Sequence, residues 1–102
     1  MKKQLWYQLN EDKTISTLPD GAYPNFRDES RRVAKDSIND IEISTVFLCL
    51  DHSYGEDGPP ILFETMIFGG ENDGWMKRYC TYDEALEGHN IVVGCIKNNK
   101  PL

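Results

Sequence analysis

The hydrophobic period of this chain changes once, at Thr81, and that change limits the folds that the chain can adopt. Before Thr81 the apolar residues stand in short runs, rich in β-branched and aromatic side chains, with turn-forming residues between them. Such runs are typical of β-strands. After Thr81 the apolar residues recur at helical spacing, and Glu84 completes a capping box with Thr81, which predicts that a helix begins here. The apolar stripe of this helix consists of Ala85, Leu86, His89, Val92, Val93 and Ile96.

The runs ahead of the helix are predicted to form an antiparallel sheet. The dipeptide Asn39-Asp40 joins two of them and predicts a hairpin. The latter half of the run 41–50 is apolar on both faces, which is expected of a central strand covered on both sides. We therefore predict one α+β domain over residues 1–102, with a sheet of about four to five strands and a C-terminal α-helix packed on one face. The predicted strands are residues 5–9, 32–38, 41–50, 61–68 and 75–80.

The composition fits a globular protein of one domain. The chain has 102 residues, of which 39% are hydrophobic and 27% are charged. No apolar run approaches the roughly 20 residues of a transmembrane helix, and the first residues lack the apolar stretch of a secretory signal, so we expect an intracellular protein without a membrane span. The odd number of cysteines (Cys49, Cys80 and Cys95) and the lack of a C-x-x-C pair argue against a disulfide framework and a zinc finger.

The charge of the chain is negative and unevenly distributed. Eleven basic and seventeen acidic residues give a net charge of −6, which disfavours direct binding to nucleic acid because such binding needs a basic surface. No basic residue occurs between Lys35 and Lys77. This interval forms either a solvated acidic surface that aids solubility, or an electronegative face for a basic partner or a divalent cation. Its nine acids are Asp36, Asp40, Glu42, Asp51, Glu56, Asp57, Glu64, Glu71 and Asp73.

Two histidines and one strand carboxylate are the candidates for a chemical site. His52 follows an apolar strand, next to Asp51, and His89 lies in the apolar stripe of the helix. A buried imidazole needs a hydrogen-bond partner, so His89 is either a structural residue or a group that faces a polar pocket. Glu64 is either exposed to solvent or turned toward the helix, where it would be the partner of His89. In the second case His52, Glu64 and His89 converge, with Asp51 nearby. Such a set suits zinc, another divalent metal or general acid–base chemistry.

Nearly half of the chain carries a distinctive pattern, the run ISTVFLCLDHSYGEDGPPILFETMIFGG followed by RYCTYDEALEGH. It resembles a widespread family of small proteins of bacteriophages and prophages, whose pattern reads STVFLGLDH, a glycine-rich loop, PPxLFETMVFGG and RYxTxxEAxxGH. The family is largely without an assigned activity. His52, Glu64 and His89 are among the matching positions. The chain departs from the family at Cys49, where glycine is usual, and at Cys80, where serine or alanine is usual, which argues against a metal role for the cysteines.

The phage origin that this resemblance implies points to a role against host defences. Small acidic phage proteins often block nucleases such as CRISPR effectors by covering basic nucleic-acid channels. We expect a non-enzymatic, anti-CRISPR-like inhibitor that binds a basic surface of such a nuclease. It would act in the cytoplasm of the bacterial host, either as a monomer or as a homodimer. The alternatives are a metal-binding protein or hydrolase built on the two histidines and Glu64, and a component of the virion or of phage metabolism. The expected partner contacts are Glu56, Asp57, Glu71 and Asp73.

Overall fold

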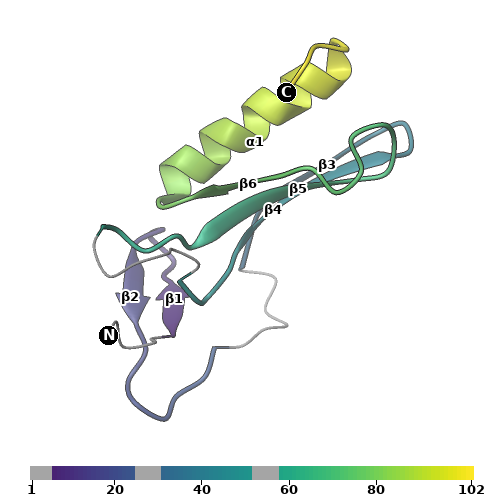
Figure 1. Cartoon of the computed structure of the whole chain (residues 1–102). Coiled ribbons are helices and arrows are strands. Elements are labelled where there is room, and N and C mark those ends of the chain that lie inside the picture. Colours follow the sequence, from purple (N-terminus) through teal and green to yellow (C-terminus); the bar gives the residue numbers. More distant parts are fainter. Residues whose placement is uncertain (1–5, 25–30, 52–57) are drawn as a thin grey trace.

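The structure, a computed structural model, describes residues 6–24, 31–51 and 58–102. Within these ranges six strands are followed by one helix, α1 (Tyr82–Lys97), as Figure 1 shows. The strands form a two-stranded and a four-stranded antiparallel sheet, and α1 lies along one face of the larger sheet. The predicted α+β fold is therefore confirmed. The strands are β1 (Tyr7–Leu9), β2 (Ile15–Thr17), β3 (Arg32–Ile38), β4 (Ile41–Phe47), β5 (Phe63–Phe68) and β6 (Met76–Tyr79).

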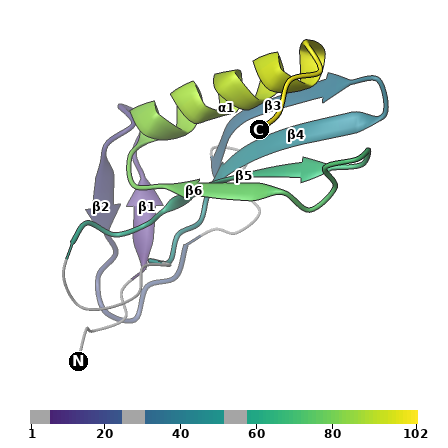
Figure 2. The same ribbon diagram turned by 45° about the horizontal axis from the view of Figure 1, so that its top comes forward.

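The strands of the large sheet lie side by side in chain order, β3-β4-β5-β6, which Figure 2 shows from a second angle. The hairpin predicted at Asn39-Asp40 is confirmed, and it joins β3 to β4. Asn39 has a φ of 54°, a left-handed conformation that asparagine tolerates in tight turns. Because a two-residue turn sets the register of both strands, Asp36 lies directly opposite Ile43.

Alternate side chains of the strands point to opposite sides of the large sheet. The side that faces α1 is fully buried at its centre and is apolar apart from Thr45 and Thr65. Its other buried members are Ile43, Phe47, Phe63, Ile67 and Tyr79. The opposite side, which α1 does not cover, is called the open face below. It consists of Arg32, Lys35 and Ser37 of β3, Glu42, Ser44 and Val46 of β4, Glu64, Met66 and Phe68 of β5, and Met76 and Arg78 of β6.

Strand β4 is central in the sheet, and within the part of the chain that the structure describes a helix covers it on one side only. Val46, on the open face, is partly exposed, so the prediction of a strand covered on both sides is wrong. The apolar residues 48–50 that suggested it lie beyond the end of β4, where the chain passes from one sheet to the other. The Leu48 amide still donates to the Leu62 carbonyl (2.7 Å), whereas the Cys49 carbonyl accepts from the Tyr7 amide of β1 (2.8 Å). The apolar character of this segment reflects its passage to the small sheet.

The small sheet contains a strand that the sequence did not predict. Strand β2 has three residues and pairs with β1 in antiparallel register. It stands between two turn-forming clusters and is too short to show an alternating pattern. Apolar side chains of both strands pack against a buried cluster that contains Phe47 and Phe63, whose ring centroids are 5.3 Å apart. The hairpin thus closes one end of the core.

Helix α1 begins as the capping box predicts. Thr81 is the N-cap residue, and its Oγ1 accepts from the Glu84 amide (3.1 Å) while Oε1 of Glu84 accepts from the Thr81 amide (3.2 Å). Ala85, His89 and Val92 of the predicted stripe are buried. Among the residues that the structure describes, no helix is long and apolar enough to cross a membrane.

Gly88 is a point of close contact between α1 and the sheet. A Cβ atom at this position would lie 2.3 Å from Oη of Tyr79 and 2.4 Å from Cε1 and Cζ of the same ring. We expect Gly88→Ala to lower the free energy of unfolding by about 1–3 kcal/mol, because the buried ring has to move. Gly94→Ala is the matched control, since a Cβ there meets nothing within 4 Å and alanine favours helix. Urea denaturation measures both variants, and equal stability would contradict this close packing.

Candidate functional site

A chain of hydrogen-bonded polar side chains joins α1 to three strands of the large sheet. His89, Thr45 and Thr65 are fully buried, and the side chain of Asp36 is 49% exposed. His89 has no exposed surface, and both of its ring nitrogens lie within hydrogen-bond distance of a strand side chain. Nδ1 is 2.7 Å from Oγ1 of Thr45 in β4, and Nε2 is 2.7 Å from Oδ2 of Asp36 in β3. Oγ1 of Thr45 is in turn 2.5 Å from Oγ1 of Thr65 in β5. This geometry favours the structural alternative for His89.

The chemistry of the side chains indicates which atom donates and which accepts in each of these hydrogen bonds. An ionised carboxylate can only accept, so Nε2 of His89 carries the ring proton and donates to Asp36. If the ring carries this one proton only, Nδ1 is an acceptor for the hydroxyl of Thr45, whose oxygen accepts from the hydroxyl of Thr65. Every donor in the network thus meets an acceptor, as buried polar groups require.

The structure separates Glu64 from His89. Thr65 faces α1, so its neighbour Glu64 points to the open face, where its Oε2 accepts from Nε of Arg78 (2.9 Å). The expectation that the helix imidazole meets Glu64 is wrong, and Asp36 takes that place. Because both nitrogens of His89 are bonded within the protein, this ring has no lone pair left for a metal ion. In the described ranges no group of three or more His, Cys, Asp or Glu side chains is placed to hold a metal.

The other predicted ligands are not brought to His89 either. Oδ1 of Asp51 accepts from the amide of Ile61 (2.8 Å), which ties the segment after β4 to the segment before β5. His52 lies outside the described residues. The same holds for Glu56 and Asp57, two of the predicted partner contacts, so the predictions on these three residues remain predictions.

Asp40, Glu71 and Asp73 gather at one end of the large sheet, which is called the acidic tip below. Asp40 belongs to the β3–β4 turn and the other two to the β5–β6 turn, at the end of the sheet far from the β1–β2 hairpin (Figure 1). The two turns touch: a Cβ at Gly69 would lie 2.6 Å from the carbonyl oxygen of Asp40, and Gly69 has a φ of 90°, so only glycine fits. The Gly69 amide also donates to Oδ1 of Asp73 (2.7 Å). These contacts hold both turns in place.

Other acids of the interval without basic residues are paired inside the protein. By contrast, Asp40 and Glu71 are exposed and form no ion pair with any residue in the described ranges. Within the described part of this interval, Lys35 and Arg78 offset the charges of Glu42 and Glu64, whereas the acidic tip keeps the charge of three exposed carboxylates. The internal pairs are Glu42 with Lys35, Glu64 with Arg78 and Asp36 with His89, at 2.7, 2.9 and 2.7 Å.

A cavity of about 580 Å³ lies beside β1, and the sequence did not predict it. The residues that line it include Tyr7, Tyr23, Arg31, Phe47 and Cys49. The guanidinium of Arg31 donates through Nε and Nη2 to the Phe47 carbonyl, at 3.2 and 3.1 Å, and so fixes one wall to the end of β4.

Cys49 has an unusual backbone for a cysteine. Its φ of 68° lies in the left-handed region, where a β-carbon is strained and glycine is favoured. Burial raises the pKa of the Cys49 thiol, and the nearby guanidinium of Arg31 opposes that rise only in part. The thiol is therefore neutral at pH 7 and acts as a small apolar side chain.

Asp36 is the network residue that the sequence reasoning missed. The signal was present, because the turn at Asn39-Asp40 places Asp36 on the same face of the hairpin as Thr45. A carboxylate on that face is anomalous if the helix packs there. The sequence does not show which face the helix covers, and Asp36 and Glu64 are on opposite faces.

Comparisons with known proteins assign neither a family nor a function to the chain. No protein-family model, curated protein or solved structure matches the chain. Function is inferred below from the residues of the chain and their geometry.

The direction of the hydrogen bonds predicts different effects for two substitutions of Asp36. Asp36→Asn keeps an acceptor for the Nε2 proton and should lower the free energy of unfolding by less than about 1 kcal/mol. Asp36→Ala leaves the buried N–H of His89 without a partner and should cost about 1–3 kcal/mol. Urea denaturation measures this difference, and nitrogen NMR should find the ring proton on Nε2. Equal losses in the two variants, or a proton on Nδ1, would show that the directions are reversed.

The backbone at Cys49 predicts the ranking of two further variants. Cys49→Gly removes left-handed strain of about 1 kcal/mol together with some buried contact, so its stability should stay within about 1 kcal/mol of the wild type. Cys49→Val is the control of similar size, and its β-branched side chain should cost at least about 2 kcal/mol in the same conformation. Thermal denaturation ranks the two. A valine variant as stable as the glycine variant would refute the left-handed conformation.

Proposed function

We propose that this chain is a small acidic phage accessory protein that inhibits a host defence system by binding a basic surface of a nuclease effector, in the manner of an anti-CRISPR protein. The observation that carries the proposal is the acidic tip, where carboxylates of two adjoining turns are exposed. The net charge of −6 and the resemblance to phage proteins support the same function.

The acidic tip offers a basic surface the same kind of charge as a phosphate backbone. Nucleic-acid channels are lined by lysine and arginine side chains that bind phosphates. Carboxylates compete for these side chains through charge-assisted hydrogen bonds. The contact between Gly69 and Asp40 and the hydrogen bond from Gly69 to Asp73 order the two turns before binding, which reduces the entropy lost in the complex.

The free energy of exposed ion pairs limits what the acidic tip contributes to the affinity of a complex. An exposed ion pair is worth about 0.2–1 kcal/mol, so three such carboxylates alone do not produce a tight complex. They raise the association rate and favour basic partners over acidic ones. Tight inhibition therefore needs further contacts, and Glu56 and Asp57, which lie outside the described residues, remain predicted partner contacts.

The metal-dependent alternative gains no support from the described residues. Glu64 and His89 lie on opposite faces of the large sheet, and each already has a partner within the protein. Any metal site that uses His52 would have to recruit other ligands. The inhibitor is therefore the function that we put forward.

A charge-neutral variant of the acidic tip tests the proposal. Asp40→Asn, Glu71→Gln and Asp73→Asn are combined, and asparagine at 73 keeps an acceptor for the Gly69 amide. Against a panel of purified CRISPR nuclease effectors, the variant should bind its target at least about tenfold more weakly than the wild type, because the charge contacts are lost. The affinity of the wild type should fall as salt rises, and the wild type should displace nucleic acid from the effector.

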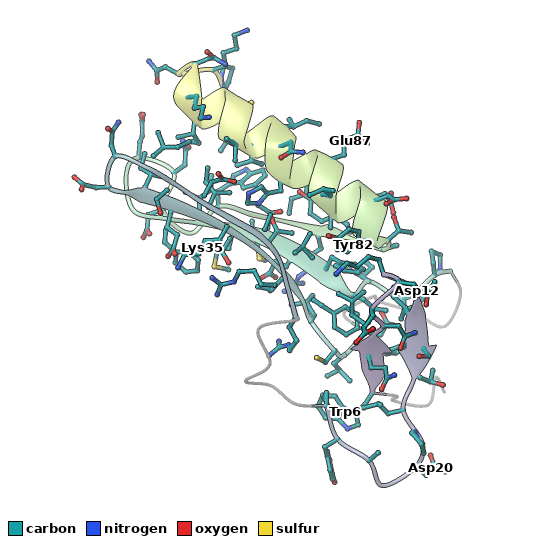
Figure 3. The ribbon with its side chains drawn as sticks, turned by 180° about the vertical axis from the view of Figure 1, so that it is seen from behind. Trp6, Asp12, Asp20, Lys35, Tyr82 and Glu87 are labelled. Carbon is teal, nitrogen blue, oxygen red and sulfur yellow. The ribbon has the colours of Figure 1, made fainter. Side chains whose placement is uncertain are left out.

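The matched control removes three exposed acids elsewhere, through Glu11→Gln, Asp83→Asn and Glu87→Gln. These acids belong to the β1–β2 turn and to α1, and Figure 3 shows Glu87 on the side of the helix away from the sheet. The control should bind like the wild type. If the tip variant and the control bind equally well, the tip is not the contact. A phage deleted for this protein that grows equally on hosts with and without the defence would contradict the inhibitor function itself.

A further inference from the structure

We propose that the open face of the large sheet is the contact surface of a homodimer, in which the open faces of two copies pack against each other. The proposal starts from a sheet that α1 covers on one side, with Lys35 visible on the other side in Figure 3. It uses no residue of the acidic tip, so it stands or falls independently of the proposed function.

The open face is more apolar than contact with water requires. Antiparallel sheets with one solvent-exposed face usually have polar residues on that face. Here Met66 lies directly opposite Met76 across the β5–β6 pair, with Phe68 and Val46 close by, and Phe68 and Met76 are each 46% exposed. Apolar groups that adjoin in this way mark an interaction surface. The flexible methionine side chains can adapt to a second surface of the same kind.

Four of the five charged side chains on the open face are paired within each copy, and the fifth is Arg32 at the start of β3. Lys35 pairs with Glu42, and Arg78 pairs with Glu64, in each case across neighbouring strands. The side chain of Glu64 is only 14% exposed, so this acid is already withdrawn from water together with its partner. A second copy of a chain with a net charge of −6 is repelled by uncompensated acidic surface but not by this face.

These properties favour a second copy as the occupant. A two-fold contact places one surface patch against the same patch of the partner, so the patch must be complementary to itself. An apolar patch with internally paired charges meets that condition. A strongly acidic or strongly basic partner would gain little from charges that are already neutralised. A two-fold axis that crosses the strands would also keep the two acidic tips at opposite ends of the dimer.

The size of the open face sets the expected strength of the dimer. Strands lie about 4.8 Å apart and rise about 3.4 Å per residue, so four strands of roughly six residues have a flat area of about 400 Å². Two such faces hide about 800 Å², and the relief of the side chains brings the total toward the roughly 1,200 Å² at which standard interfaces begin. We therefore expect a dimer of micromolar rather than nanomolar affinity.

Sedimentation equilibrium on the full chain, from about 1 μM to about 1 mM, tests the proposal. The wild type should pass from monomer to dimer within this range. Phe68→Asp and Met76→Lys should each raise the dissociation constant at least about tenfold. Lysine at 76 makes the net charge of −6 less negative, so a weaker dimer in this variant cannot be due to added repulsion between acids. Ile91→Asp is the control, because Ile91 is 59% exposed and belongs to α1 rather than to the open face.

Circular dichroism of each variant separates loss of the dimer from loss of the fold. If Phe68→Asp does not fold, Met76→Lys on the short edge strand β6 still tests the same face. A wild type that stays monomeric over the whole range overturns the proposal. A dimer that Ile91→Asp weakens as much as the open-face variants also overturns it, because the contact would then involve α1.

Discussion

The arrangement of the whole domain depends on the buried polar contact between His89 and the sheet. Apolar packing is not directional, and by itself it would let α1 lie at several positions over the strands. The imidazole between Thr45 and Asp36 selects one of them, because a shifted helix would leave buried donors and acceptors unpaired at about 1–3 kcal/mol each. Burial thus supplies most of the stability, while the polar network and the close contact at Gly88 set the position of the helix.

The position of α1 also determines which surfaces of the sheet remain available. With one face covered, two classes can be distinguished among the described acids between Lys35 and Lys77. Some are paired with cations on the open face or with His89, and others are exposed at the acidic tip. The first class gives a surface without strong charge, which suits self-association, and the second gives a charged surface, which suits a basic partner. A dimer formed through the open face would present two acidic tips and could gain avidity on a target with two matching sites.

Much of the secondary structure could be predicted because it depends on local chemistry. The β3–β4 hairpin followed from a turn dipeptide between two extended runs, and the start of α1 followed from the capping box at Thr81. The candidate site was harder, because it depends on contacts between distant segments. Glu64 was expected to meet His89, yet it lies on the other face, and Asp36 fills that place. Residues 48–50 were apolar because they meet the small sheet, not because a second layer covers β4.

The sequence by itself determined the period of each element, the turn that sets the register of β3 against β4, and the grouping of side chains into two faces, since each is decided within a few residues of chain. Only the tertiary structure decided which of the two faces the helix covers. Both faces carry apolar residues together with carboxylates, Asp36 on the covered face and Glu42 and Glu64 on the open face, so alternation alone does not distinguish them. The choice follows from the pairing of one imidazole with Thr45 and Asp36, which are 44 and 53 residues away in the chain.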